Sequence, residues 1–266
     1  SGEAFLTKNF GEEVGGRLHT GRSSGDLVAV SVRVTLRNGL LDIMSEVIML
    51  REVLTNFSEK HVNAVMPSYS HLQHAQTTTF AHYLLSWLGP LERDFKRLLS
   101  LYSRVNVSPA GAAIGTGSDF PLNRRRTAHL LGFNDVIDNT KDAIFNVDHL
   151  LEAHSVQSLI AVTLSRMAQD LIMWSSHEFQ MVELADRYCD TSSIMPQKKN
   201  PHSLEILRGI CSEQIGRLMG ALDLSKTPSD SIDPITIVPE AMWTSIEKSA
   251  KIIRLIGGIV SSLEIN

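Results

Sequence analysis

Residues 32–57 read "VRVTLRNGLLDIMSEVIMLREVLTNF", and this stretch decides the fold class. Apolar residues recur along it at intervals of three and four: Leu36, Leu40, Ile43, Met44, Val47, Ile48, Leu50, Val53, Leu54 and Phe57. An α-helix turns once every 3.6 residues, so this spacing places them on one broad face. The stretch therefore predicts a long helix that is buried over much of its surface.

Similar periodicity predicts further helices over residues 77–103, 203–224 and 239–263. Residues 143–185 contain no glycine or proline, which predicts either one very long helix or two helices end to end. Residues 1–16 resemble the interior of a helix followed by a turn, and strand-like alternation is scarce. We therefore predict an all-α fold, a bundle of long helices completed by other subunits.

The composition argues against a nucleic-acid-binding protein, a disulfide-bonded protein and a membrane protein. A formal charge of −4 does not favour nucleic-acid binding, which is typical of basic surfaces. The two cysteines, Cys189 and Cys211, lie far apart in sequence and are expected to be free thiols in a reducing compartment. No charged-then-apolar leader and no apolar run of about 18 residues is present, so we expect a cytoplasmic protein without membrane contact.

The most polar segment, residues 189–209, reads "CDTSSIMPQKKNPHSLEILRG". Ser192 and Ser193 are followed within a few residues by Lys198 and Lys199. Hydroxyls, backbone N–H groups and cations in one turn suit a small anion that gains negative charge during a reaction. A solvated loop whose lysines face water is the alternative.

Residues 68–76 read "SYSHLQHAQ". His71 and His74 lie three apart, but no acidic or thiol partner is near enough in sequence to favour a metal site. General acid–base work or hydrogen bonding to an anion is the interpretation for His71. We interpret His74 and His82 as structural histidines.

Residues 15–26, "GGRLHTGRSSGD", combine glycines with hydroxyls and one histidine. Neither the Walker spacing nor a preceding strand is present, so a nucleotide loop is not favoured. The simple alternative is a turn that leads into a helix near Gly25 or Asp26.

Taken together, the three polar segments resemble the signature regions of the fumarase/aspartase superfamily. "SSIMPQKKNP" at residues 192–201 matches the pattern Gly-Ser-Ser-x-Met-Pro-x-Lys-x-Asn from its first serine onward, and its Gln-Lys-Lys form is similar to the argininosuccinate lyase branch. "GRLHTGRSSGD" and "SYSHLQHAQ" resemble that branch's first and second regions, and "LSRMAQDLIMWSSHEFQMVEL" and "GGIVSSLEIN" extend the likeness. Full members of the family are several hundred residues long. The resemblance thus implies residues 1–30 as the end of an N-terminal domain and residues 31–266 as the central helical domain, with the C-terminal domain absent or truncated.

The resemblance implies a β-elimination that releases fumarate. A loop serine, as alkoxide, removes a proton, and the base would be Ser192. Lys198 and Asn200 would bind the carboxylate on which charge accumulates, and His71 would pair with Glu205. Further positions match regions expected to contact a small dicarboxylate substrate: Ser70, Gln73, Ser193, Met195, His19, Thr20, Ser23 and Ser24. The family implies no metal or other cofactor, and a homotetramer in which three subunits share each site.

Several positions depart from the branch. Thr191 replaces the glycine before the serine pair, and Ser24-Gly25 replaces an Arg-Asn pair. Val147 stands where the branch has arginine, and residues 223–241 replace the segment that grips the amine. We therefore predict a carbon–nitrogen lyase acting on an N-substituted aspartate, argininosuccinate or an analogue. The alternatives are a fumarase-like C–O lyase and a catalytically silent, crystallin-like structural homologue.

Overall fold

The computed structural model describes residues 2–266. Long helices dominate: α3 (Ser24–Lys60), α5 (Leu88–Val105), α8 (Asp148–Trp174), α9 (His202–Leu224) and α10 (Asp233–Val260). Short helices are α1 (Gly2–Phe10), α2 (Glu12–Gly15), α4 (Phe80–Leu85), α6 (Arg124–Leu130), α7 (Thr140–Phe145) and the 3₁₀ turn η1 (Asp186–Tyr188). The predicted all-α bundle of long helices is confirmed.

The strands found within residues 2–266 form four separate two-stranded pairs. β1 (Val65–Ser70) and β2 (Gln73–Thr79) make an antiparallel hairpin, and β3 (Val107–Ser108) and β4 (Asp135–Val136) pair in parallel. The other two antiparallel pairs join β5 (Val182–Glu183) to β8 (Glu264–Ile265) and β6 (Asp190–Thr191) to β7 (Lys199–Asn200).

The chain divides into two compact units. Unit 1 comprises the residues up to Asn38, Leu101–Leu150 and Leu222–Glu240. Unit 2 comprises Gly39–Ser100, Leu151–Ala221 and Ala241–Asn266. The predicted domain division at residue 30 stays a prediction.

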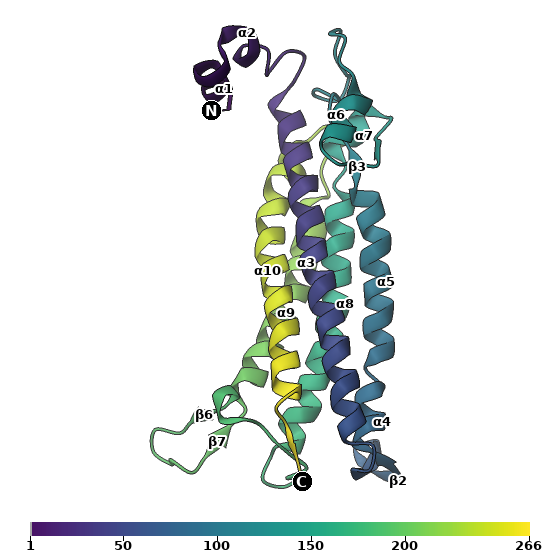
Figure 1. Cartoon of the computed structure of the whole chain (residues 1–266), viewed down its shortest axis with the longest axis vertical. Coiled ribbons are helices and arrows are strands. Elements are labelled where there is room, and N and C mark those ends of the chain that lie inside the picture. The colour runs from purple at the N-terminus through teal and green to yellow at the C-terminus, as the bar shows by residue number, and fades with distance from the viewer. Residues whose placement is uncertain (1) are drawn as a thin grey trace. The chain divides into compact units, whose positions relative to one another are not determined.

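The core of unit 2 lies between α3, α8, α9 and α10, which run side by side there (Figure 1). Their fully buried side chains are mainly leucine and isoleucine, including Ile43, Leu54, Ile160, Leu207 and Ile253. Gly39 marks a close approach of α3 to α10, since a Cβ there would lie 2.7 Å from the Ile246 side chain. The residues of 32–57 that were predicted to face the core thus do so, except for a few, such as Ile48, that remain half-exposed.

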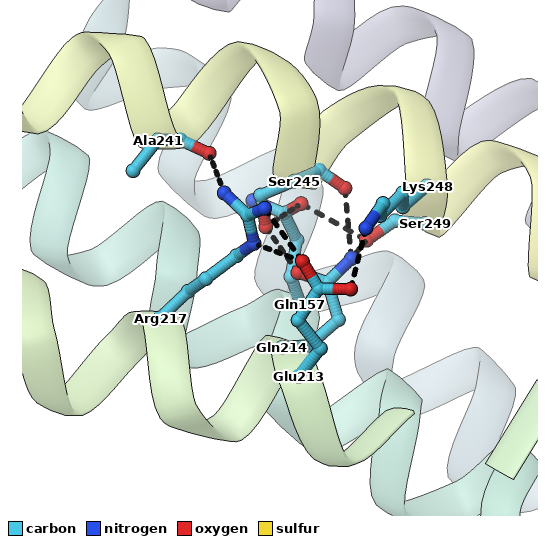
Figure 2. A network of polar contacts seen from close by, with 8 residues as sticks. All are labelled: Gln157, Glu213, Gln214, Arg217, Ala241, Ser245, Lys248 and Ser249. Carbon is cyan, nitrogen blue, oxygen red and sulfur yellow. Dashed lines mark hydrogen bonds and ion pairs between the residues drawn. The ribbon is translucent and has the colours of Figure 1, made fainter. Parts of the chain in front are cut away.

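Unit 2 also holds a buried polar cluster, Gln157, Gln214, Ser245 and Ser249, each no more than 1% exposed (Figure 2). The Gln214 amide donates to the Ser245 carbonyl at 2.9 Å and to the Ser249 hydroxyl at 3.1 Å. The Ser249 and Ser245 hydroxyls lie 2.9 and 3.1 Å from Gln157 Oε1. The cluster ties α8, α9 and α10 together, because each helix supplies groups that another helix satisfies.

An ion-paired group lies beside the polar cluster (Figure 2). Glu213 accepts from Arg217 at 2.6 Å and from Lys248 at 2.5 Å, and Arg217 also donates to the Ala241 carbonyl. These contacts add a second, partly exposed link between α9 and α10.

Unit 1 is organised by two arginines on α3. Arg33 donates to the carbonyls of Arg104 and Val105 in the last turn of α5, and burial lowers its pKa to about 10. Arg37, one helical turn later, donates to Asn106 Oδ1 at 2.7 Å and to the Gly132 carbonyl at 2.9 Å. Both side chains satisfy backbone carbonyls that helix or turn hydrogen bonds would leave open.

Three predicted helices needed correction. Residues 77–79 belong to β2, and the rest of the predicted 77–103 helix is split between α4 and α5. Pro90 explains the split, since it has no N–H to donate to the Ser86 carbonyl. The helix predicted to start at Pro239 begins at Asp233 instead and holds the proline inside α10. Packing of the buried Ile235 and Val238 outweighs the local cost of the proline.

Residues 143–185 form neither one very long helix nor two helices that fill the segment end to end. α7 and α8 are separated at Asn146, whose backbone is extended, and α8 ends at Trp174. Beyond it, the Ser175 and Ser176 hydroxyls bond back to the carbonyls of Ile172 and Met173. Such local bonds compete with the next helical turn, so the last ten or so residues are not helical.

Candidate active site

Residues 191–199, which comprise the turn between β6 and β7 and the two strand residues that flank it, are here called the Ser192 loop. It is held at its base by the pairing of Asp190 with Asn200 and of Thr191 with Lys199. Within it the Lys198 N–H donates to the Met195 carbonyl at 2.9 Å, which closes a turn over Pro196 and Gln197. Figure 1 shows the loop extending away from the helices of unit 2.

The Ser192 hydroxyl oxygen faces two backbone donors. It accepts from Met195 N at 3.1 Å, and Ile194 N lies 3.4 Å away. Two amides aimed at one oxygen stabilise negative charge on it, as in an oxyanion hole. Ser192 is half-buried, whereas Ser193 is exposed and Met195 is 43% exposed.

The two adjacent lysines of the loop differ in their surroundings. Lys199 Nζ lies 2.9 Å from Glu183 Oε1 and 2.8 Å from Asp186 Oδ1. Within residues 2–266 Lys198 has no ion-pair partner and its side chain is exposed. Lys198 is therefore the cation available to a ligand.

The second polar segment forms the tip of the β1–β2 hairpin. Ser70 pairs with Gln73, and the two residues between them, His71 and Leu72, have φ angles of 51° and 59°. A two-residue turn with both φ positive normally uses asparagine and glycine. Ordinary side chains held in this conformation are strained, and such strain is concentrated at functional sites. Ser70, His71 and Gln73 are all exposed.

A cavity of about 600 Å³ lies behind the hairpin, also lined by α4 and the end of α8. Tyr83 donates to Asp170 Oδ2 at 3.0 Å in its wall. Burial raises the pKa of both groups; for Tyr83 the nearby Asp170 carboxylate raises it further, while the hydrogen bond from Tyr83 moderates the rise for Asp170. His82 lies 2.9 Å from the Thr78 hydroxyl, in keeping with a structural role, and His74 packs edge-on against Tyr69.

The first polar segment lies in unit 1. His19 and Thr20 lie in turns ahead of α3 and are exposed, as is Ser24, while Ser23 is half-buried and accepts from Gly25 N at 3.2 Å. Gly21 needs its φ of 66° and its lack of Cβ, because a Cβ would lie 2.8 Å from Ser118 Oγ. The predicted helix near Gly25 begins at Ser24.

Asp26 is a residue of this segment to which the sequence assigned no role. It is 2% exposed and accepts from Ala112 N at 3.1 Å and Ala113 N at 3.0 Å. Burial raises the pKa of its carboxyl group, and the backbone donors oppose that rise. Its carboxylate at the start of a 37-residue helix is also favoured by the helix dipole. Asp26 thus fixes the loop after Pro109 against the first turn of α3.

Within unit 2, the hairpin tip and the Ser192 loop lie at the same end but on opposite sides (Figure 1). No hydrogen bond or ion pair among residues 2–266 joins His71 to Glu205. Glu205 instead lies 3.3 Å from His202 Nδ1, one turn away on α9, and Asn200 is half-buried at the base of the loop. The pairing expected for His71 and Glu205 is not made within one chain.

Comparisons with known proteins relate these features to a family. A family model described as "Lyase" matches residues 4–216. The argininosuccinate lyase of Methanosarcina acetivorans is 43% identical over 265 residues, which are 99% of this chain and 54% of that protein. The argininosuccinate lyase of Methanocaldococcus jannaschii is 39% identical over 99% of this chain and 55% of that protein. The chain thus spans about half the length of these curated relatives.

Solved structures of related lyases have the same fold as this chain. EDDS lyase in complex with formate has a TM-score of 0.90 at 34% identity, over 99% of this chain and 52% of that one. Class II fumarase from Schistosoma mansoni shares the fold, with a TM-score of 0.83 at 18% identity over 92% of this chain and 57% of that one. The predicted resemblance is confirmed: the chain belongs to the lyase family, in the argininosuccinate lyase branch of the fumarase/aspartase superfamily.

Proposed function

We propose that this chain carries the elimination chemistry of a carbon–nitrogen lyase that releases fumarate from an N-substituted aspartate. The observation that supports it best is the Ser192 oxygen facing the amides of Met195 and Ile194, in a chain 43% identical to argininosuccinate lyases. A variant of EDDS lyase, 34% identical to this chain, was solved with bound fumarate, which supports a fumarate-binding site.

The chemistry assigns roles to the Ser192 loop. As alkoxide, Ser192 takes a proton from the carbon beside the one bearing nitrogen. Because a serine hydroxyl is a very weak acid, its alkoxide needs the two amides and exclusion of water. Lys198 and Asn200 hold the carboxylate on which the electron pair accumulates. That electron pair then forms the C=C double bond of fumarate as the C–N bond breaks. The electrons of the broken bond leave on the nitrogen of the amine, which takes a proton from an acid such as His71.

We propose a homotetramer in which three chains contribute to each site. The exposed His71 tip and the absence of an internal His71–Glu205 contact support it. The outer face of α9 supports it too: Gly209, Gly216 and Gly220 lie opposite the buried Leu207 and Cys211, and a Cβ at any of the three glycines would meet nothing within 4 Å. Open glycines on one helix face allow close approach of another helix.

The residues expected to contact the amine part of the substrate differ from those of the branch. Ser24, Gly25 and Val147 replace polar groups of the branch, and Val147 is buried, so the amine is proposed to differ from that of argininosuccinate. The domain division at residue 30 and a cytoplasmic location are also proposed. Both cysteines are free, which favours a reducing compartment, and no described helix is long and apolar enough to span a membrane.

The test is to incubate the full-length protein with fumarate and a panel of amines and to follow the loss of fumarate absorbance. Amine-dependent loss, with an N-substituted aspartate as product, is expected. Loss without amine, giving a hydroxy acid, would instead indicate the C–O lyase. No turnover and no exchange of the Cβ proton of any aspartate derivative would indicate the silent homologue.

A further inference from the structure

Lys199 lies next to the proposed ligand cation Lys198 but faces other groups. Its ammonium contacts Glu183 at 2.9 Å and Asp186 at 2.8 Å, and its side chain is only 33% exposed. Both carboxylates belong to residues 182–188, here called the anchoring segment, which lies 11 or more residues earlier in the chain. Lys199 therefore joins the end of the Ser192 loop to a separate part of unit 2.

The anchoring segment is fixed to the helical core. Glu183 lies between Val182 and Leu184, which are 3% and 2% exposed, and pairs with Glu264 in the β5–β8 ladder. At its other end, Tyr188 packs against α10, where a Cβ on Gly258 would lie 2.3 Å from the tyrosine oxygen. The carboxylates that hold Lys199 are thus carried by a segment that is held at both ends.

The orientation of Lys199 determines that of its neighbours. Lys199 and Asn200 form β7, and successive side chains of an extended strand point to opposite faces. When Lys199 faces the anchoring segment, Asn200 faces away from it, and Lys198, just before the strand, stays exposed. A one-residue slip would turn Lys199 outward and Asn200 inward, and would move the adjacent Lys198 with them.

The charge on Lys199 persists at neutral pH. Partial burial opposes the charge on Lys199, but hydrogen bonds to Asp186 and Glu183 outweigh it and raise the pKa of the ammonium. The hydrogen bond from Lys199 lowers the pKa of Asp186. Because the Glu183 and Asp186 side chains are 54% and 96% exposed, the contact is accessible to salt and reversible.

We infer that Lys199 is a positioning residue of the proposed site: its ion pairs with Glu183 and Asp186 fix the register of β7, so that Lys198 and Asn200 point toward the substrate. This inference rests on the proposed function, in which Lys198 and Asn200 bind the carboxylate. The two adjacent lysines then have separate roles, since Lys198 binds the ligand while Lys199 holds the loop.

The first test is hydrogen exchange in the full-length protein without substrate. Lys199→Gln should raise the exchange rates of the amides of residues 190–200 by about tenfold, while Lys199→Arg should leave them near wild type. A matched control is Lys251→Gln, which removes another ion-paired lysine of unit 2, 2.6 Å from Glu247, and should leave the loop unchanged. Unchanged exchange in Lys199→Gln would overturn the inference.

The second test uses kinetics. Lys199→Gln should lower kcat by about 5- to 20-fold, and so should the double variant Glu183→Gln with Asp186→Asn. Combining all three changes should cost no more than either set, because both remove the same contact. Wild-type kcat should fall with added salt, and that of Lys199→Gln should not.

A Lys199→Arg variant as impaired as Lys199→Gln, or losses that multiply in the combined variant, would overturn the inference, because Lys199 would then act other than through its ion pairs. Failure of the proposed function is distinguishable: wild-type protein that forms no fumarate would refute the lyase, whereas the exchange measurement would still show whether Lys199 holds the loop.

Discussion

Unit 2 contains two groups of polar side chains that differ in where their partners lie. The buried cluster of Gln157, Gln214, Ser245 and Ser249 finds its partners within the chain and is sealed from water. The Ser192 loop exposes Ser193 and Lys198, and within residues 2–266 Lys198 has no ion-pair partner. Polar groups that are satisfied inside the chain maintain the fold, while those left open are available to substrate or to other copies. Changes in the two groups should therefore affect different quantities.

The largest effect is expected at the loop. Ser192→Ala removes the proposed base and should lower the rate of fumarate formation by about 10³-fold or more, a loss of the size found when an essential general base or oxyanion partner is removed. The thermal unfolding midpoint should stay within about a degree of wild type, because Ser192 supports no core contact. Ser31→Ala, on the exposed side of α3, serves as control and should change neither quantity. Retained activity in Ser192→Ala would refute the assigned base.

The next largest effect is expected in the buried cluster. Gln214→Leu should lower the free energy of unfolding by about 2–4 kcal/mol, since the Ser245 carbonyl and the Ser249 hydroxyl each lose a partner. Urea unfolding at fixed protein concentration measures it, and the kcat of the folded fraction should be unchanged. Gln169→Leu, on the exposed side of α8, removes only a solvent-accessible contact with Arg208 and should change stability by less than about 1 kcal/mol. Equal losses in the two variants would contradict a special role for the cluster.

A pH effect of intermediate size is expected beside the cluster. His154 is 1% exposed, and burial, together with the nearby Arg217 charge, lowers its pKa to about 4. Its pKa in the unfolded chain is near 6.5, so the unfolded state binds the proton first as the pH falls. The free energy of unfolding should therefore fall by up to about 3 kcal/mol as the pH is lowered from 6.5 to 4.

His154→Leu isolates that contribution. The variant should show a smaller loss of unfolding free energy than wild type over this pH range, whatever its stability at pH 7. Parallel pH profiles for the two proteins would show that His154 is not the group responsible.

The smallest effect is expected on the surface. Lys251→Gln breaks an exposed pair with Glu247 and should change the free energy of unfolding by less than about 0.5 kcal/mol. Thermal unfolding of the two proteins side by side measures it. A change as large as that of Gln214→Leu would mean that exposure does not separate the two kinds of polar group.

The sequence predicted much of the fold because helical periodicity is a local signal. The core face of α3 and the start of α9 follow directly from it. The β1–β2 hairpin was not predicted, because its turn residues are His71 and Leu72 rather than the asparagine and glycine that are typical of such turns. The end of α8 at Trp174 depends on hydroxyls that bond back to the helix, which periodicity does not register.

The sequence predicted which residues belong to the candidate site but not which of them contact each other. Ser192 and Lys198 fall in the Ser192 loop and Asn200 lies at its base, yet Glu205 contacts His202 rather than His71. The role of Lys199 follows from two carboxylates that the fold brings to it, and a sequence alone does not reveal that juxtaposition. Strand alternation at Lys199 and Asn200 was the signal that could have placed these two side chains on opposite faces.

In the proposed homotetramer, the open polar groups of one chain are completed by other chains. Full-length Ser192→Ala and His71→Asn proteins, each inactive alone, can be unfolded together and reassembled into mixed oligomers. If different chains supply Ser192 and His71, some sites in the mixture receive both intact residues, and fumarate-forming activity returns. Mixed oligomers that form but remain as inactive as their parents would contradict a site to which different chains supply Ser192 and His71.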